Sequence, residues 1–133
     1  MIVVLDSCVW VSALRFGGTP LVALRHTYNH HRIACCAEIE AEVERTLRGK
    51  FGWSRTSILE TMNKVLKDAL RVQISGTLTG ICRDQNDNMV VECAAVARAE
   101  FIVSGDKDLL SLAVYKQIRI LSPAEYIRLP IAS

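Results

Sequence analysis

Carboxylates follow two short hydrophobic runs that lie near opposite ends of this sequence. Residues 2–5 (Ile-Val-Val-Leu) run directly into Asp6, and residues 101–103 (Phe-Ile-Val) precede Asp106 and Asp108. Apolar runs of this kind are typical of buried parallel strands, and open α/β sheets bind ligands outside the carboxyl ends of such strands. Each acid also stands where a helix cap is expected, a position that Asp favours. Because Asp6 and Asp106 occupy equivalent strand ends, we expect them to meet in one crevice.

Further candidate acids lie on two predicted helices. Asp87 precedes Val90 and Val91 by three and four residues, so it should lie over the buried side of a helix, whereas Asp84 is earlier in the preceding loop and freer to point outward. The helix predicted at 37–48 carries four glutamates. Periodicity does not choose between Glu40 and Glu42, because they border opposite edges of its apolar stripe.

The chemistry that these side chains favour is binding of a hard divalent cation. Converging carboxylates repel each other unless a cation or a proton neutralises them, and a site made of oxygen ligands alone suits Mg²⁺ or Mn²⁺. Such a cation polarises a phosphoryl oxygen and acidifies water for attack on phosphorus. The sequence has neither a glycine-rich phosphate loop with its lysine nor a Ser-His-Asp arrangement, since its three histidines lie together within residues 26–31.

The elements that must position these acids alternate between strand and helix. The sequence predicts strands at 2–5, 33–36, 72–74, 101–103 and 118–121, and helices at 8–16, 20–30, 37–48, 54–70, 87–99 and 107–113, with a last helical turn after Pro123. Connections this short imply a mainly parallel sheet covered by helices on both faces, an α/β fold.

Composition narrows the class of protein. A chain of 133 residues, half of them hydrophobic, predicts a single domain over 1–133. Five cysteines without CxxC spacing argue against a disulfide framework and a structural zinc site. No apolar run is long enough to cross a bilayer and no basic leader precedes the first one, so we expect a cytoplasmic protein without a membrane partner. A net charge of +2 is compatible with nucleic acid.

Three segments together resemble the PIN domain, and most closely its bacterial and archaeal branch of VapC-like toxins from toxin–antitoxin systems. They are Val3-Val4-Leu5-Asp6-Ser7, the stretch from Cys82 to Asn88, and Ile102-Val103-Ser104-Gly105-Asp106-Lys107-Asp108-Leu109-Leu110. The resemblance extends over residues 2–128. It implies a Rossmann-like three-layer sandwich and a ribonuclease that depends on Mg²⁺ or Mn²⁺ and leaves a 5′-phosphate.

The resemblance also implies roles for particular residues. The catalytic and metal-binding acids fall on Asp6, Glu42, Asp87 and Asp106, with Asp84 and Asp108 as additional candidates. Ser7 and Ser104 would donate hydrogen bonds that fix carboxylate rotamers. We expect RNA as substrate, an antitoxin protein as partner, and a homodimer or higher homo-oligomer. Arg15, Arg83 and Lys107 are neighbours of the acidic motifs in sequence and are our candidates for RNA phosphate contacts.

One residue departs from the family pattern. The family commonly has asparagine two positions after its first aspartate, whereas this sequence has Cys8, whose thiol is a weaker hydrogen-bonding group. The alternative function is therefore a catalytically weakened RNA- or protein-binding module on the same fold. A phosphate-accepting receiver domain needs a lone aspartate at a strand end in mid-chain, which this sequence lacks.

Overall fold

The computed structural model describes residues 1–130, which alternate between strands and helices as the sequence predicts. In chain order the elements are β1 (Ile2–Leu5), α1 (Ser7–Arg15), α2 (Gly18–His30), β2 (Arg32–Cys36), α3 (Ala37–Phe51), α4 (Arg55–Val65), β3 (Leu70–Val72), α5 (Gln85–Ala97), β4 (Phe101–Val103), α6 (Lys107–Leu112), β5 (Val114–Tyr115), β6 (Ile118–Leu121) and α7 (Pro123–Ile127).

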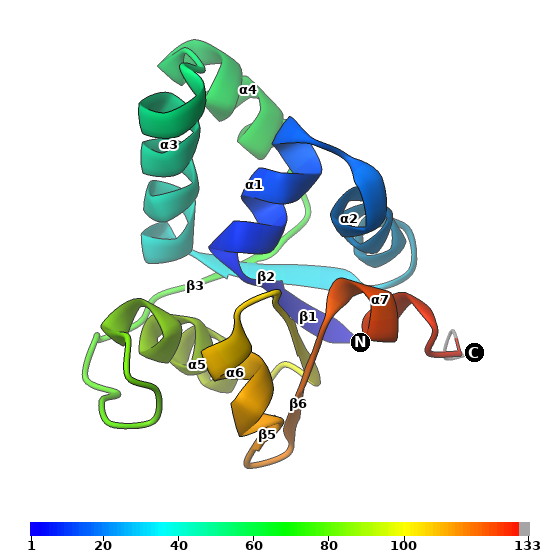
Figure 1. Ribbon diagram of the computed structural model, residues 1–133, viewed down its shortest axis with the longest axis vertical. Coiled ribbons are helices and arrows are strands. Elements are labelled where there is room, and N and C mark those ends of the chain that lie inside the picture. Colours follow the sequence, from blue (N-terminus) through cyan, green and yellow to red (C-terminus); the bar gives the residue numbers. More distant parts are fainter. Residues whose placement is uncertain (131–133) are drawn as a thin grey trace.

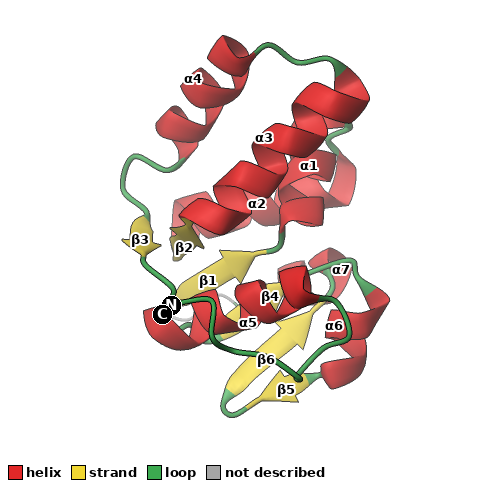
Figure 2. Ribbon diagram, turned by 90° about the vertical axis from the view of Figure 1, so that its left-hand side faces the viewer, coloured by secondary structure: helices red, strands yellow, loops and turns green. Residues whose placement is uncertain are grey.

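The strands form one six-stranded sheet in the order β3-β2-β1-β4-β6-β5. Every neighbouring pair is parallel except β5 and β6, and Figure 2 shows β1 and β6 running in the same direction. The first strand, β1, therefore lies beside β4 although about a hundred residues separate them, and Leu5 is in register with Val103. This pairing brings the carboxyl ends of β1 and β4 to the same edge of the sheet.

Helices cover both faces of the sheet. Helices α1 to α4 lie on one side, whereas α5 and α6 lie on the other (Figure 1). The expected mainly parallel α/β fold is confirmed. Residues 3–5 of β1 are inaccessible to solvent, and one hydrophobic core includes Trp10, Leu47, Ile102 and Leu109. Among the described residues, no single helix is long and apolar enough to cross a membrane.

Helix α3 is longer than the sequence predicts. We expected it to stop at Gly49, but it continues to Phe51, and Gly52 takes the left-handed conformation with φ of 68°. The backbone N–H groups of Gly52 and Trp53 then bond to the carbonyls of Arg48 and Leu47, which closes the helix. Gly49 is exposed and remains helical, so a glycine that tolerates the helix looks the same in sequence as one that ends it.

Helix α4 and the strand that follows it also differ from the prediction. Helix α4 ends at Val65 instead of residue 70, and the strand expected at 72–74 is β3 at Leu70–Val72. Leu66 and Leu70 continue the apolar pattern of α4, but Leu70 pairs with Ala34 in the sheet, so the tertiary contact overrides the helical pattern. The sequence also gave no sign of β5, a two-residue strand that pairs antiparallel with β6.

Candidate metal centre

Asp6 lies at the carboxyl end of β1, where its backbone N–H donates to the carbonyl of Val103 on β4. Its residue is buried and its side chain makes no capping hydrogen bond to α1. The carboxylate instead accepts hydrogen bonds from the side chains of Ser104 (2.7 Å), Cys8 (3.2 Å) and Ser7 (3.4 Å). The helix-cap interpretation therefore does not explain this aspartate.

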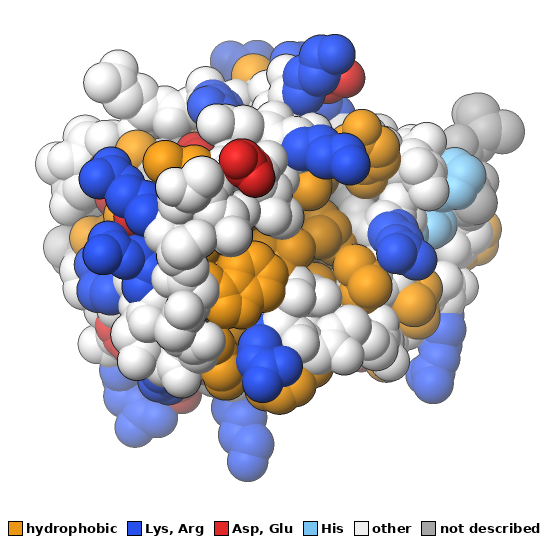
Figure 3. All heavy atoms as spheres, turned by 90° about the horizontal axis from the view of Figure 1, so that it is seen from above, with side chains coloured by type: hydrophobic (Ala, Val, Ile, Leu, Met, Phe, Trp, Pro, Cys, Tyr) orange, Lys and Arg blue, Asp and Glu red, His pale blue; other side chains and the backbone are white. Residues whose placement is uncertain are grey.

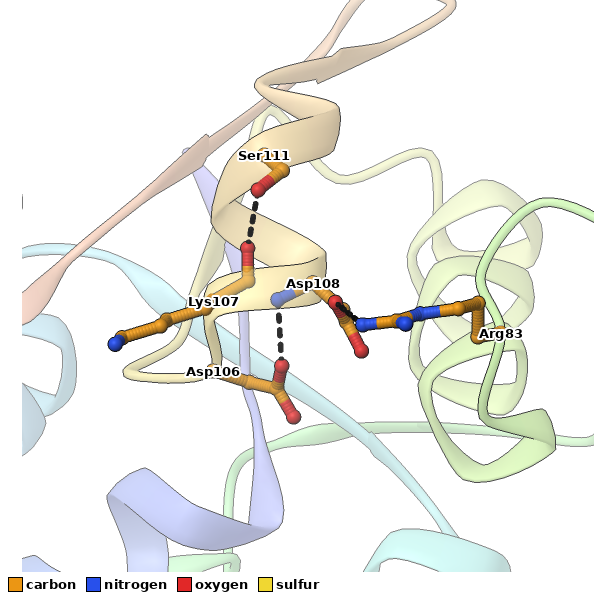
Figure 4. Close-up of polar contacts among 5 residues, drawn as sticks. All are labelled: Arg83, Asp106, Lys107, Asp108 and Ser111. Carbon is orange, nitrogen blue, oxygen red and sulfur yellow. Dashed lines mark hydrogen bonds and ion pairs between the residues drawn. The ribbon is translucent and has the colours of Figure 1, made fainter.

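Ser104 links the two strand-end acids. Its fully buried hydroxyl donates to Asp6 Oδ2 and accepts a 2.9 Å hydrogen bond from the backbone N–H of Asp106. Asp106 does cap a helix, since its Oδ1 accepts from the N–H of Asp108 at 2.8 Å. One oxygen of Asp106 is thus used by α6, and the other remains available (Figure 4).

Three carboxylates come together at this edge. Asp87, Asp106 and Asp108 each offer an oxygen atom within 4.8 Å of the others. Asp87 belongs to the first turn of α5, whereas Asp106 and Asp108 belong to the start of α6. The sequence placed Asp108 among the secondary candidates, and the structure makes it one of the three clustered carboxylates.

Asp87 has the most perturbed environment of the cluster. Its residue is 6% exposed, and its Oδ2 has no hydrogen-bond partner among the described residues. Burial and then the charges of Asp106 and Asp6, with smaller effects from Asp84 and Asp108, raise the pKa of Asp87 to about 7. Ionising the Asp87 carboxylate therefore costs free energy unless a positively charged group lies beside it.

The other predicted acids in α3 and before α5 are outside this cluster of three carboxylates. Asp84 is exposed and caps α5, accepting from the N–H of Asn86 at 2.9 Å. Glu40 forms a 3.7 Å ion pair with Arg71 and faces the hollow between α3 and α4. Glu42 lines a different hollow, between α3 and α1, together with Ser7 and Cys8. Of the two glutamates, Glu42 is therefore the one that shares a hollow with the side chains bonded to Asp6.

The basic residues expected near RNA have different surroundings. Arg83 forms a 2.9 Å ion pair with Asp108, and this hydrogen bond and charge raise the pKa of Arg83 further. Figure 4 shows the Lys107 side chain pointing away from that pair. Arg15 lies at the far end of α1, where its guanidinium stacks on the rings of Phe16 and Phe51.

Cys8 occupies the position where the family commonly has asparagine. Burial of its thiol and the charge of Asp6 raise the pKa of Cys8 to about 12. The thiol is therefore protonated at neutral pH and donates to Asp6 Oδ2, and its sulfur lies 4.0 Å from the Ser104 hydroxyl. A protonated thiol thus supplies a hydrogen bond to the first acid, although a weak one.

Two side chains of α5 that hold the loop between β3 and α5 were not identified from the sequence. Glu92 is buried and accepts hydrogen bonds from the backbone N–H groups of Ser75, Gly76 and Leu78 and from the Ser75 hydroxyl. Asn88 is 2% exposed and bonds to both the N–H and the carbonyl of Cys82. A charged residue inside the apolar stretch 90–94 was the signal that could have identified Glu92.

The residues present fit a hard divalent cation. All three clustered side chains are carboxylates, and four acids contribute to the raised pKa of Asp87. The buried Asp87 Oδ2 has no hydrogen-bond partner within residues 1–130. Oxygen ligands of this kind suit Mg²⁺ or Mn²⁺, which neutralise the mutual repulsion. The arrangement can therefore bind a cation and present it at an open edge of the sheet.

Comparison with known proteins identifies a family and a structural neighbour. The family model described as PIN domain matches residues 2–108. A chain in the crystal structure of VapBC2 from Rickettsia felis, bound to a DNA fragment from their promoter, has the same fold with a TM-score of 0.62 and 12% sequence identity. The match covers 90% of this chain and 97% of that one. No curated protein matches this sequence. Since the family model spans most of the sequence, the chain belongs to the PIN-domain family.

Proposed function

We propose that this protein is a Mg²⁺- or Mn²⁺-dependent endoribonuclease. The observation that carries the proposal is the buried Asp87 carboxylate beside Asp106 and Asp108, one oxygen of which has no partner in the part of the chain that the structure describes. Leaving such a carboxylate among like charges costs free energy, which a cation removes. Membership of a family whose members are generally nucleases supports the same conclusion.

The cation would be held by acids from four segments of the chain: the end of β1, α3, α5 and the start of α6. We assign Asp6, Glu42, Asp87 and Asp106 to the site, and we add Asp108 because its carboxylate lies within 4.8 Å of two of them. A divalent cation bound there supplies positive charge to a phosphodiester and acidifies water for attack on phosphorus.

Hydroxyl and thiol groups would keep the acids in position. Ser104 donates to Asp6 while its oxygen accepts from the backbone of Asp106, so one side chain fixes the separation of two acids. Ser7 and Cys8 donate to Asp6 from the first turn of α1. These contacts orient the carboxylates before the substrate arrives, which is the usual contribution of such outer groups.

The test is cleavage of a mixed RNA pool by the purified protein in Mn²⁺, in Mg²⁺ and in EDTA. We expect cutting that needs the metal and falls by at least about 100-fold in Asp106→Asn, because a ligand is lost. Asp68→Asn, which removes an exposed carboxylate after α4, is the matched control and should cut normally. Folded wild-type protein that cuts no RNA in either metal would contradict the proposal.

We extend the proposal to a toxin whose activity an antitoxin blocks. Helices α1, α2 and α4 enclose a hollow of about 440 Å³ lined by Leu14, Leu21, Leu24 and Val65, with Arg25 and Lys64 at its edge. Apolar walls with a basic edge suit an acidic segment of an antitoxin. The likeness to a VapBC2 chain supports a partner of this class.

Expression of this protein alone would test the toxin assignment. We expect growth arrest of the host with the wild type and normal growth with Asp106→Asn at equal protein level. Light scattering on the purified Asp106→Asn protein would measure the expected homodimer or higher homo-oligomer. Normal growth with active, soluble wild-type nuclease would rule out a toxin while leaving the ribonuclease in place.

The second candidate is a binding module with weakened catalysis, favoured by one observation. The bond that Asp6 Oδ2 accepts from Cys8 at 3.2 Å comes from a thiol, which is a weaker donor than the Ser104 hydroxyl. This candidate predicts RNA binding without turnover in metal, and cleavage restored by Cys8→Asn. Turnover by the wild-type protein would exclude it.

A further inference from the structure

A groove lies between α1 and α3, next to the residues that bond to Asp6. It has a volume of about 300 Å³, begins at Ser7 and Cys8, and ends at Phe16, Lys50 and Phe51. Cys8 connects it to the proposed metal site through its hydrogen bond to Asp6. Its length follows α1, whose nine residues extend roughly 13 Å. The groove, with Glu42 in its lining, therefore extends from the neighbours of Asp6 to a second surface at the other end of α1.

The far end of the groove combines aromatic rings with positive charge. Phe16 is 68% exposed, and its ring meets the Phe51 ring edge to face at 5.6 Å. The Arg15 guanidinium lies 5.0 Å and 5.3 Å from the centres of these two rings, and the exposed Lys50 borders the same hollow. Figure 3, a view onto α1 to α4, shows hydrophobic side chains gathered in the middle of this face with lysines and arginines around them.

This combination has the chemistry of a binding surface for single-stranded nucleic acid. An exposed aromatic ring stacks on an unpaired base of any identity, and adjacent cations contact the backbone phosphates. The acidic end of the groove repels phosphate unless a cation is present, whereas the basic end attracts it. Bases inside a duplex hide their faces, so the rings select an unpaired segment.

We infer that the groove between α1 and α3 binds the unpaired RNA strand beside the cleavage point, with Phe16 stacking on one base and Arg15 and Lys50 contacting its phosphates. The inference rests on the proposed ribonuclease function. Phe16 sets the distance between a stacked base and the acids, so it is a positioning residue that fixes where an unpaired strand is cut.

The first experiment measures binding without catalysis. Anisotropy of a fluorescent single-stranded RNA in EDTA should show Kd rising roughly 10- to 100-fold in Phe16→Ala, the range for loss of one base stack. Phe16→Trp keeps an aromatic face and should bind like the wild type. Val96→Ala, which trims an exposed apolar residue of α5, is the control. Equal affinities for Phe16→Ala and Phe16→Trp would overturn the inference.

A second experiment locates the stacked base. A series of RNAs, each with one base removed to leave an abasic sugar, is measured against wild type and Phe16→Ala. At one position, the losses of binding free energy caused by removing the base and by removing the ring should not add, because both changes delete the same contact. Arg15→Gln and Lys50→Gln should each reduce the slope of log Kd against log salt concentration by the amount that corresponds to about one phosphate contact. Additive losses at every position would contradict stacking by Phe16.

These experiments distinguish a failure of the groove proposal from a failure of the ribonuclease proposal. Metal-dependent RNA cleavage by the wild type, with Phe16→Ala binding and cutting at the same sites as wild type, overturns the groove and leaves the ribonuclease. Absence of cleavage in a folded wild type overturns the ribonuclease and the groove with it. A shift of cleavage sites in Phe16→Ala that Phe16→Trp reverses supports both.

Discussion

The carboxylate of Asp87 shows how single side chains shape this site. In the free acid form it fits its buried position, but ionisation places a charge beside Asp106 and Asp6. Its pKa of about 7 lies well above that of the unfolded chain, so the folded protein holds this proton more tightly between about pH 4 and pH 7. Stability contributed by the proton is therefore complete in acid and lost as the pH rises through 7.

The direction of this pH dependence leads to a prediction for the stability of the metal-free protein. Asp87→Asn should be more stable than the wild type at pH 8 by roughly 1–3 kcal/mol, because it removes a repelled charge, and the difference should vanish near pH 4. Urea unfolding in EDTA at both pH values measures it. Equal stability of the two proteins at pH 8 would contradict the raised pKa. Glu60→Gln, on the exposed surface of α4, controls for loss of any carboxylate.

At this scale the sequence predicted the position of strand-end residues better than that of their neighbours. Asp6 and Asp106 could be paired in advance because each follows a buried strand, and β1 and β4 are neighbours. Asp108 and Glu92 could not, since their directions depend on how α6 and the loop before α5 pack. Periodicity could not choose between Glu40 and Glu42, whereas the resemblance to the PIN domain implied Glu42.

Among the elements, α5 does more than cover the sheet. Its buried Glu92 gathers the N–H groups of residues 75–78, while Asn88 binds Cys82 farther along the same loop. Burial alone raises the pKa of Glu92, but the hydrogen bonds from Leu78, Ser75 and Gly76 lower it below its usual range. The loop that carries Arg83 and Asp84 is thus fastened at two points to the helix that carries Asp87.

Glu92→Gln should loosen this fastening. An amide replaces an acceptor oxygen with a donor that faces N–H groups, so we expect a loss of about 1–3 kcal/mol in unfolding free energy at neutral pH. The loss should shrink in acid, as Glu92 of the wild type becomes protonated below its lowered pKa. Hydrogen exchange of residues 75–78 reads out the loop itself. Unchanged protection there, with Glu60→Gln as the reference, would contradict the role of Glu92.

The sequence predicted the type of nearly every element but not every boundary. Strands β1 and β4 were clear because buried parallel strands are continuously apolar. The end of α4 was not, since Leu66 and Leu70 continue its apolar stripe while the chain has already turned towards β3. Strand β5 has two residues and cannot display an alternating pattern.

For the molecule as a whole, the proposed cation should act as a stabilising ligand. The site joins α5, α6 and β1, so binding reports on the complete fold. Mn²⁺ at about 100 times its Kd should add roughly 2.7 kcal/mol, or some 5–10 °C in Tm, by mass action. Calorimetry in Mn²⁺ and in EDTA measures the shift. It should be absent in Asp106→Asn and retained in Asp68→Asn, and an equal shift in all three proteins would rule out this site.

The distance along the chain between Asp6 and Asp108 has a consequence for biosynthesis. A nascent chain that ends within α5 already contains Asp6 and Asp87 but has neither β4 nor the start of α6. Because β1 must wait for β4 to pair with it, the acids meet only after the ribosome has released residue 108 and the strand has folded. If the protein cuts RNA as proposed, its own messenger and translating ribosome are spared until the segment that contains Asp108 has been made and has folded.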